Sequence, residues 1–133
     1  MKRTLDKKLF FSMTLDFLDV YIPQDSPSIK TVKTYRDGLT VFRRYVCDEK
    51  HLSISSFRFE DCTFDLVLDY RNWLLDEKKR ARSTVNNRLA VIKSYVRYAS
   101  ARDVTLQQVF LSISEVPFLS VEKRIRPVIE DNR

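Results

Sequence analysis

Residues 78–102 form the most basic stretch of the chain, and they read KKRARSTVNNRLAVIKSYVRYASAR without a single acidic residue. The chain holds 24 lysines and arginines against 18 aspartates and glutamates, and eight of the basic residues lie in this stretch. Without those eight, 16 basic residues face 18 acidic ones, so the rest of the chain has a net charge of −2. Because lysine and arginine neutralise phosphates, such a segment points to nucleic acid; the simpler interpretation is a solvated helix face.

A helical wheel divides this stretch into an apolar and a polar side. At 100° per residue, one narrow arc collects the residues that should face a core, namely Val85, Leu89, Ile92, Val96 and Ala99. The other side carries cations for phosphates, asparagines that can pair with adenine edges, and small residues that allow close approach in a major groove. We expect this side to face solvent and to bind DNA through Arg82, Asn86, Asn87, Lys93, Ser94 and Arg97.

A second predicted helix, over residues 28–49, offers a weaker version of the same pattern. Its buried stripe recurs every three or four residues and comprises Val32, Tyr35, Leu39, Phe42 and Val46. On the side away from that stripe, Asp37 lies among the cations, so this surface alone would be unremarkable. Beside the acid-free helix it supplies four more DNA-binding candidates, which are Lys30, Lys33, Thr34 and Arg44.

Residues suited to catalysis or metal binding are scarce. His51 is the only histidine, and Cys47 and Cys62 form no C-x-x-C pair, so neither a zinc site of usual spacing nor a catalytic triad can be assembled. One glycine, Gly38, excludes a glycine-rich phosphate loop. We therefore expect no catalytic residue, no cofactor and no metal. The tyrosines at helical spacing are expected to pack with their hydroxyls at the surface; these are Tyr35, Tyr45, Tyr70, Tyr95 and Tyr98.

The composition favours an all-α domain, because one glycine and four prolines in 133 residues are too few for the tight turns of a sandwich or barrel. Apolar periodicity predicts helices over residues 10–22, 28–49, 64–78, 84–101 and 104–113. The first should bury Phe10, Phe11, Leu15, Leu18 and Ile22. We expect Pro23 to end it, Thr63 or Asp61 to cap the third helix, and Ser83 or Thr84 to cap the fourth.

The two ends of the chain show no further core element. Acidic residues interrupt the N-terminus where a signal peptide needs an apolar run, and no window approaches the roughly 18 apolar residues of a membrane span. We therefore expect a soluble, cytoplasmic protein with no membrane partner. After Pro117 the periodicity stops, and residues 117–133 have no face to bury. This segment is interpreted as a linker.

Two motifs carry a family resemblance. Residues 26–46, SPSIKTVKTYRDGLTVFRRYV, resemble the S-x-x-T-[IV]-x-x-Y-x-x-x-L helix that opens the core-binding domain of tyrosine recombinases, and the matching positions are Ser28, Thr31, Val32, Tyr35 and Leu39. Residues 83–99, STVNNRLAVIKSYVRYA, resemble the later S-x-T-[IV]-N-x-R-L-x-x-[IL]-[KR]-x-[YF] helix of that domain. The positions that match there are Thr84, Asn86, Arg88, Leu89, Ile92, Lys93 and Tyr95.

The resemblance implies a fold, a function and partners. It implies a SAM-like orthogonal bundle of about four to five helices in residues 1–116, followed by a linker in 117–133 toward a catalytic domain absent from this chain. In that family the helices matching 28–49 and 84–101 face the DNA major groove. The implied partners are a double-stranded recombination site, the C-terminal catalytic domain of the same protein and other recombinase protomers.

The resemblance also implies what this chain does not do. The family's catalytic domain supplies two arginines, a lysine, histidines and a tyrosine nucleophile, whereas this chain has no H-x-x-R motif. We expect it to be no enzyme itself, but part of a tyrosine recombinase or integrase encoded by a bacterium, a phage or another mobile element.

Two other functions are consistent with the residues. A helical protein–protein interaction module with a solvated basic helix would show the same composition. A small transcriptional regulator is a weaker alternative, because a helix-turn-helix needs a short turn between its helices.

Overall fold

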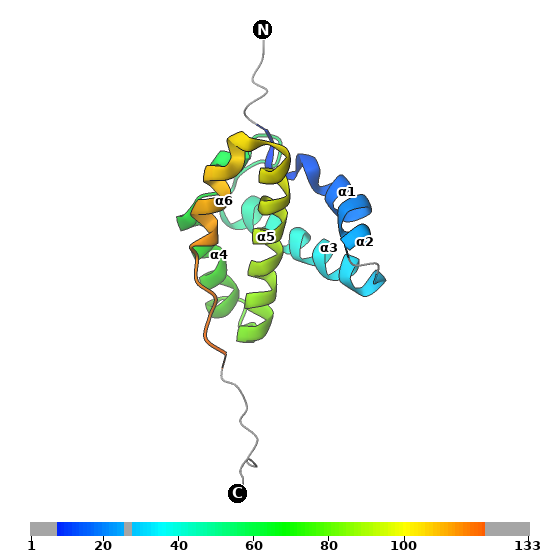
Figure 1. The fold of residues 1–133 in the computed structure, drawn as a ribbon. Helices are drawn as coiled ribbons and strands as arrows, with labels where there is room; N and C mark the ends of the chain where they lie inside the picture. The colour runs from blue at the N-terminus through cyan, green and yellow to red at the C-terminus, as the bar shows by residue number, and fades with distance from the viewer. Residues whose placement is uncertain (1–7, 26–27, 122–133) are drawn as a thin grey trace, which may run out of the picture.

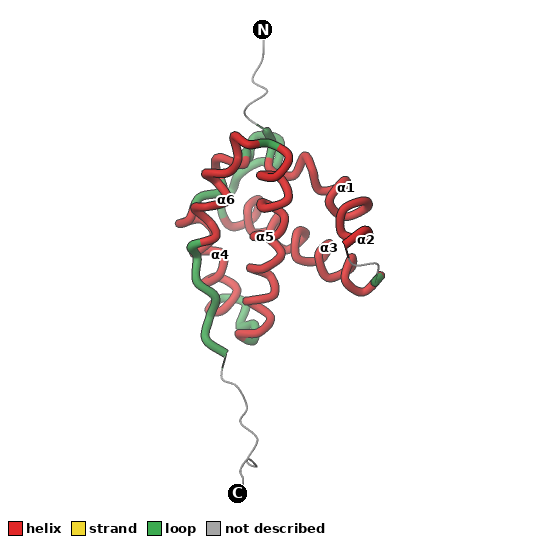
Figure 2. Tube along the Cα trace, viewed as in Figure 1, coloured by secondary structure: helices red, strands yellow, loops and turns green. Residues whose placement is uncertain are grey.

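The computed structural model describes residues 8–25 and 28–121, and within these ranges the fold is all-α (Figures 1 and 2). No β-strand occurs in this part of the chain, where the one sheet-like pairing is an isolated bridge between Leu9 and Arg58. The helical elements in chain order are η1 (Phe10–Met13), α1 (Thr14–Asp16), η2 (Phe17–Tyr21), α2 (Ile22–Asp25), α3 (Ile29–Arg44), η3 (Tyr45–Glu49), η4 (Phe59–Asp61), α4 (Phe64–Asp76), α5 (Arg82–Arg102), η5 (Val104–Leu106) and α6 (Gln107–Ser114).

All five predicted helices are present, with ends that differ by a few residues. Thr63 caps α4 as predicted, because its hydroxyl accepts a hydrogen bond from the Leu66 amide at 3.2 Å. The predicted cap of α5 at Ser83 or Thr84 is wrong, since α5 already begins at Arg82 and Ala81 is its N-cap residue.

The first helical segment departs from the prediction because its turns are irregular. η1 is a 3₁₀ turn and η2 is a π turn, so the rotation per residue changes and a 100° wheel loses its phase. Leu15, expected in the core, is 73% exposed, and Phe17 is buried instead. Pro23 does not end the helix, which continues to Asp25. The π turn before it has already displaced the carbonyl ladder with which a proline ring would clash.

Helix α5 is the centre of the bundle. Figure 1 shows it running the length of the molecule, with α3 crossing it and α4 and α6 lying alongside. Its predicted core residues are all fully buried, and they are Val85, Leu89, Ile92, Val96 and Ala99. Val91, Tyr95 and Tyr98 are buried as well, on a flank of the helix next to this arc. α5 is therefore covered on several sides.

Buried aromatic residues join the N-terminal helices to α5. The Tyr95 hydroxyl donates to the Phe10 carbonyl and accepts from the Met13 amide at 3.1 Å. The expectation that the tyrosine hydroxyls reach the surface is wrong for Tyr95, and also for Tyr70 and Tyr98, whose hydroxyls are buried without a hydrogen-bond partner. The sequence pattern placed these tyrosines at the edge of the core, but in the structure the core around α5 buries their side chains, hydroxyls included.

The crossing of α3 and α5 depends on the one glycine of the chain. A Cβ atom at Gly38 would lie 2.8 Å from Val91 Cγ1, closer than two carbon atoms approach in folded proteins. Val91 is itself buried, so its side chain has no free space into which to move. Gly38 therefore sets how closely the two helices approach.

We expect Gly38→Ala to lower the free energy of unfolding by about 1–2 kcal/mol, measured by urea denaturation. Overpacking typically costs about 1–3 kcal/mol, and the higher helix propensity of alanine offsets up to about 1 kcal/mol of this. Alanine at position 91 would keep the Cβ atom that lies 2.9 Å from the added methyl, so the control background is Val91→Gly. There the clash is removed, and Gly38→Ala should be neutral or stabilising. Equal destabilisation in both backgrounds would show that the crossing does not depend on this contact.

Candidate nucleic-acid interface

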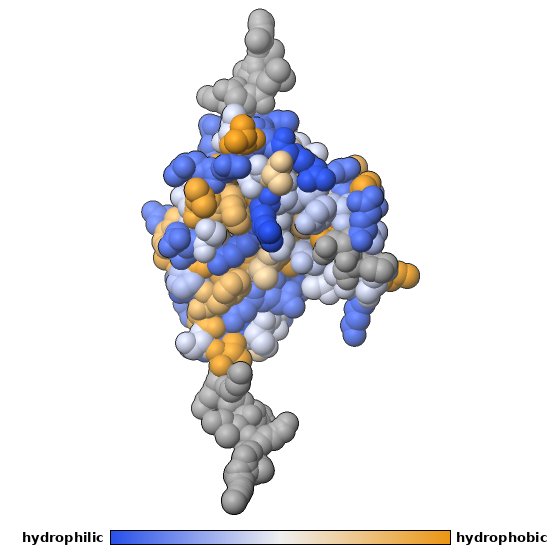
Figure 3. Space-filling view, viewed as in Figure 1, coloured by the Kyte–Doolittle hydropathy of each residue, from blue (hydrophilic) through white to orange (hydrophobic). Residues whose placement is uncertain are grey.

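One side of α5 remains open to solvent. We call it the outer face of α5; it comprises Ser83, Asn87, Ala90, Ser94, Arg97 and Ala101. Its side chains are small or polar, none is acidic, and only Ala90 and Ser94 are half-buried. The view in Figure 3 is centred on α5, and hydrophilic residues cover much of this side of the molecule. A helix with such a face can approach another surface closely.

The segment after α6 lies along one edge of this face. We call residues 115–121 the C-terminal strap. The Lys93 Nζ atom donates to the carbonyls of Ser114 at 3.4 Å and Val116 at 2.5 Å, and it lies 4.1 Å from the centroid of the Phe118 ring. Ser114 is the last residue of α6, where a cation also interacts favourably with the helix dipole. Burial lowers the pKa of the Lys93 amine, and Glu115 acts in the opposite direction.

Asn86 holds the strap further along α5. Its side-chain amide donates to the Leu119 carbonyl at 2.9 Å, and its side-chain oxygen accepts from the Leu119 amide at 2.8 Å. Arg82 adds a bond to the Ser120 carbonyl at 3.3 Å, and Arg71 on α4 adds one to the Pro117 carbonyl at 2.9 Å. These side chains satisfy an extended backbone that has no strand partner.

The strap corrects two expectations from the sequence. Residues 117–121 do contact the domain, and Val116 just before them is fully buried; residues 122–133 of the expected linker lie outside the described part of the chain. Asn86 and Lys93, expected to face solvent, are half-buried and bonded to the strap. A helical wheel missed this because it places both residues beside the core arc, where they are within reach of whatever covers the edge.

The α3 candidates have different surroundings. Lys33 forms an exposed ion pair with Asp37 at 2.9 Å, and this bond, followed by the charges of Lys33, Arg88 and Arg36, lowers the pKa of the Asp37 carboxyl. The Thr34 hydroxyl donates to the Lys30 carbonyl at 3.0 Å. Lys30 and Arg44 are exposed. The positive charge of Lys33 is thus partly neutralised locally, whereas Lys30 and Arg44 keep theirs.

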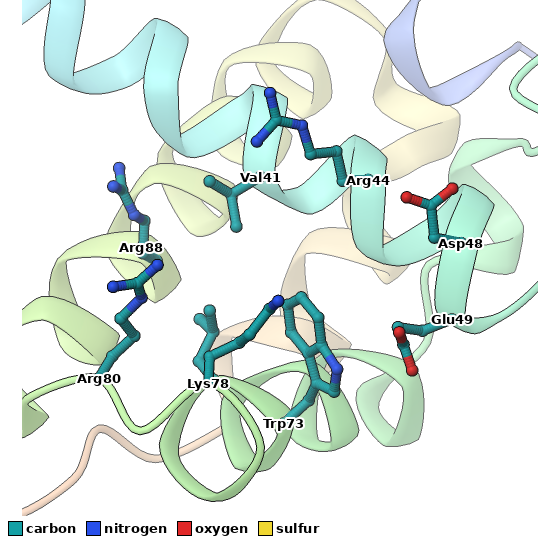
Figure 4. Close-up of a pocket in the computed structure, with 9 residues that line it drawn as sticks. Val41, Arg44, Asp48, Glu49, Trp73, Lys78, Arg80 and Arg88 are labelled. Atoms are coloured by element: carbon teal, nitrogen blue, oxygen red, sulfur yellow. The ribbon is translucent and has the colours of Figure 1, made fainter.

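A second basic surface combines Arg44, which the sequence analysis assigned to the DNA-binding site, with three cations that it did not assign. A cleft of about 190 Å³ lies between α3, α4 and α5, and four cations line it: Arg44, Lys78, Arg80 and Arg88 (Figure 4). We call it the basic cleft. The acid-free stretch already contained Lys78, Arg80 and Arg88, but two of these belong to the α4–α5 loop, and a helical wheel says nothing about a loop. Only the crossing of α3 over α5 brings Arg44 to them.

The described residues offer no metal site, because no group of three or more histidine, cysteine or carboxylate side chains is close enough together. None of the helices within the described ranges is long and apolar enough to cross a membrane.

The fold and the site together define an all-α bundle whose central helix presents one small, acid-free polar face. In a comparison with protein families, residues 10–115 match the phage integrase SAM-like domain. The chain belongs to this family, consistent with the N-terminal domain of a tyrosine recombinase. No match was found among the curated proteins or among the solved structures.

The strap can be tested through Asn86. We expect Asn86→Ala to raise the hydrogen-exchange rate of the Leu119 amide about tenfold or more and to lower the free energy of unfolding by about 1–2 kcal/mol, because two hydrogen bonds are lost. Asn87→Ala is the matched control, since its side chain belongs to the exposed outer face and should leave both quantities unchanged. If the two variants behave alike, the strap is not held by Asn86.

Proposed function

We propose that this chain binds double-stranded DNA as the core-binding domain of a tyrosine recombinase that acts in DNA integration. The observation that carries the proposal is the outer face of α5, which has six small or polar residues and no acid, so that a helix could enter a major groove closely. Membership of the phage integrase SAM-like family supports DNA as the partner.

The contacts divide into three groups. Asn87, Ser94 and Arg97 lie on the outer face and are proposed to read base edges and phosphates. On α3, Lys30, Lys33, Thr34 and Arg44 are proposed to approach the DNA backbone, with Lys33 weakened by its pairing to Asp37. The remaining candidates are Arg82, Asn86 and Lys93, whose polar atoms bond to the strap in this structure. They are proposed to contact DNA only when the strap is released.

The same proposal extends to the larger protein. Residues beyond the strap are proposed to lead to a catalytic domain, and protomers are proposed to assemble on the recombination site. The chain by itself is proposed not to cut DNA. Burial raises the pKa values of the hydroxyls of Tyr45, Tyr70 and Tyr95, which leaves them poor nucleophiles and supports a non-catalytic role.

The first test is the salt dependence of duplex binding. With roughly four to six phosphate contacts, a plot of log K against log salt should have a slope of about −4 to −5. Fluorescence anisotropy with a labelled random duplex, at several sodium chloride concentrations, measures it. Absence of binding at low salt, or binding that does not change with salt, would favour the helical protein–protein module instead.

The second test separates charge from sequence reading on the outer face. Arg97→Ala should flatten the salt slope by about 0.9, because one phosphate contact is lost. Asn87→Ala should instead reduce discrimination among duplexes selected from a random pool by about 1–3 kcal/mol per base pair read. Arg43→Ala removes one exposed cation from another side of α3 and is the control. An equal effect of Arg43→Ala and Arg97→Ala would mean that α5 contributes only net charge.

A further inference from the structure

The basic cleft combines side chains from three separate elements. Arg44 comes from α3, Arg88 from α5, and Lys78 and Arg80 from the loop between α4 and α5. Figure 4 shows Arg80 and Arg88 at one end of the cleft and the carboxylates of Asp48 and Glu49 at the other. The floor and walls are apolar, formed by Val41, Leu74 and Trp73. Positive charge is therefore concentrated at one end of a small hollow.

Among the described residues, the four cations of the cleft form no ion pair, although Arg88 is near enough to Asp37 for its charge to lower the pKa of that carboxyl. None of them forms an ion pair or donates a side-chain hydrogen bond within residues 8–25 and 28–121, although Asp48 and Glu49 line the same cleft. Elsewhere on the surface the chain does pair such groups, as in Lys33 with Asp37 and Lys50 with Asp69. The guanidinium groups of Arg80 and Arg88 thus lie together at one end of the cleft, Lys78 lies over the Trp73 ring, and Arg44 extends from the α3 side (Figure 4). That arrangement fits an anion with several acceptor oxygens.

The loop that supplies two of these cations has a strained backbone. Lys79 adopts φ of 54°, in the left-handed region that favours glycine. A lysine in this conformation costs of the order of 1 kcal/mol relative to glycine. It stands at the end of α4, where the Arg80 amide donates to the Leu74 carbonyl at 3.0 Å and closes the last turn. Lys78 and Arg80 flank this residue and both line the cleft. The end of α4 thus brings these two side chains to the same hollow.

The surroundings of Trp73 indicate which chemical group of a ligand the cleft can bind. Tyr45 and Tyr70 pack against its ring with centroids 5.1 and 6.3 Å away, and the Lys78 ammonium lies 5.3 Å from its centroid. The ring is thus already in contact with three neighbours, so it is poorly placed to stack on a nucleobase. Its contact with Lys78 holds a cation at the cleft. The site is suited to recognise a phosphate group and not a base.

We propose that the basic cleft is a phosphate-binding site that takes a backbone phosphodiester of the bound duplex. The proposal rests on the proposed DNA binding and adds to it a contact that is separate from the outer face of α5. Because the ligand is a phosphate, the cleft anchors any sequence equally. It raises affinity without contributing to base discrimination.

The test compares two double variants of equal charge. Arg44→Ala with Arg80→Ala removes two exposed arginines from the cleft, and Arg36→Ala with Arg43→Ala removes two exposed arginines that line a different depression, beside Thr14 and Leu18. The cleft variant should weaken duplex binding about tenfold or more and flatten the salt slope by about 1.8, that is 0.9 for each lost contact. It should leave the preference among sequences unchanged. The control should have a much smaller effect.

Trp73 provides a local readout, because it is the only tryptophan of the chain and forms a wall of the cleft. Its fluorescence should change when duplex binds to the unmodified protein and should change less in the cleft variant. Inorganic phosphate, added against sodium chloride of equal ionic strength, is the second probe. It should produce a weaker change in the same direction.

The outcomes separate the cleft from the DNA-binding function. If the cleft variant and the control bind duplex equally, the cleft proposal is overturned and DNA binding stands. If the unmodified protein does not bind duplex, the proposed function fails; a phosphate response lost in the cleft variant would then indicate a free phosphate ligand, which overturns the phosphodiester assignment. Loss of base discrimination in the cleft variant would also contradict the assignment of the cleft to a backbone phosphodiester.

Discussion

The contact between Gly38 and Val91 determines how the bundle is assembled. With no side chain at Gly38, α3 lies against α5 closely enough that an added Cβ would be 2.8 Å from Val91. This crossing places the cationic end of α3 beside the α4–α5 loop and turns one flank of α5 away from solvent. The basic cleft depends on that geometry, because the crossing brings Arg44 of α3 to Lys78, Arg80 and Arg88.

Burial of α5 on several sides explains why so little of it remains available for binding. The predicted apolar arc accounts for the contacts with the core, but Val91, Tyr95 and Tyr98 bury a second flank against α3 and the N-terminal helices. The strap covers part of a third flank. Residues 78–102 contain eight cations, but Arg97 is the only one of them on the outer face of α5. Of the other cations, Arg82 and Lys93 bond to the strap, Lys78, Arg80 and Arg88 line the cleft, and Arg102 pairs with Asp16.

The side chains that hold the strap have a physical role that composition did not indicate. An extended segment beside a helix has backbone groups without strand partners, and polar side chains at the edge of a core are able to satisfy them. Asn86 satisfies both the amide and the carbonyl of Leu119, and Lys93 takes up the carbonyls at the end of α6. Together with Arg71 of α4, these side chains hold the strap against the bundle.

The fold class, the five main helices and the core arc of α5 could be predicted from the sequence, because these follow from local periodicity and from the scarcity of turn residues. The family could likewise be predicted, through motifs spaced along two helices. Tertiary structure alone decided which polar residues remain free. Asn86 and Asn87 are adjacent and chemically identical, yet one bonds to the strap and the other faces solvent. Likewise, the irregular turns around Phe17 shifted the buried face away from Leu15, and Arg44 reached Arg80 and Arg88 only through the helix crossing. Local patterns report which residues share a helix face, but the partner that covers that face comes from segments distant in the chain.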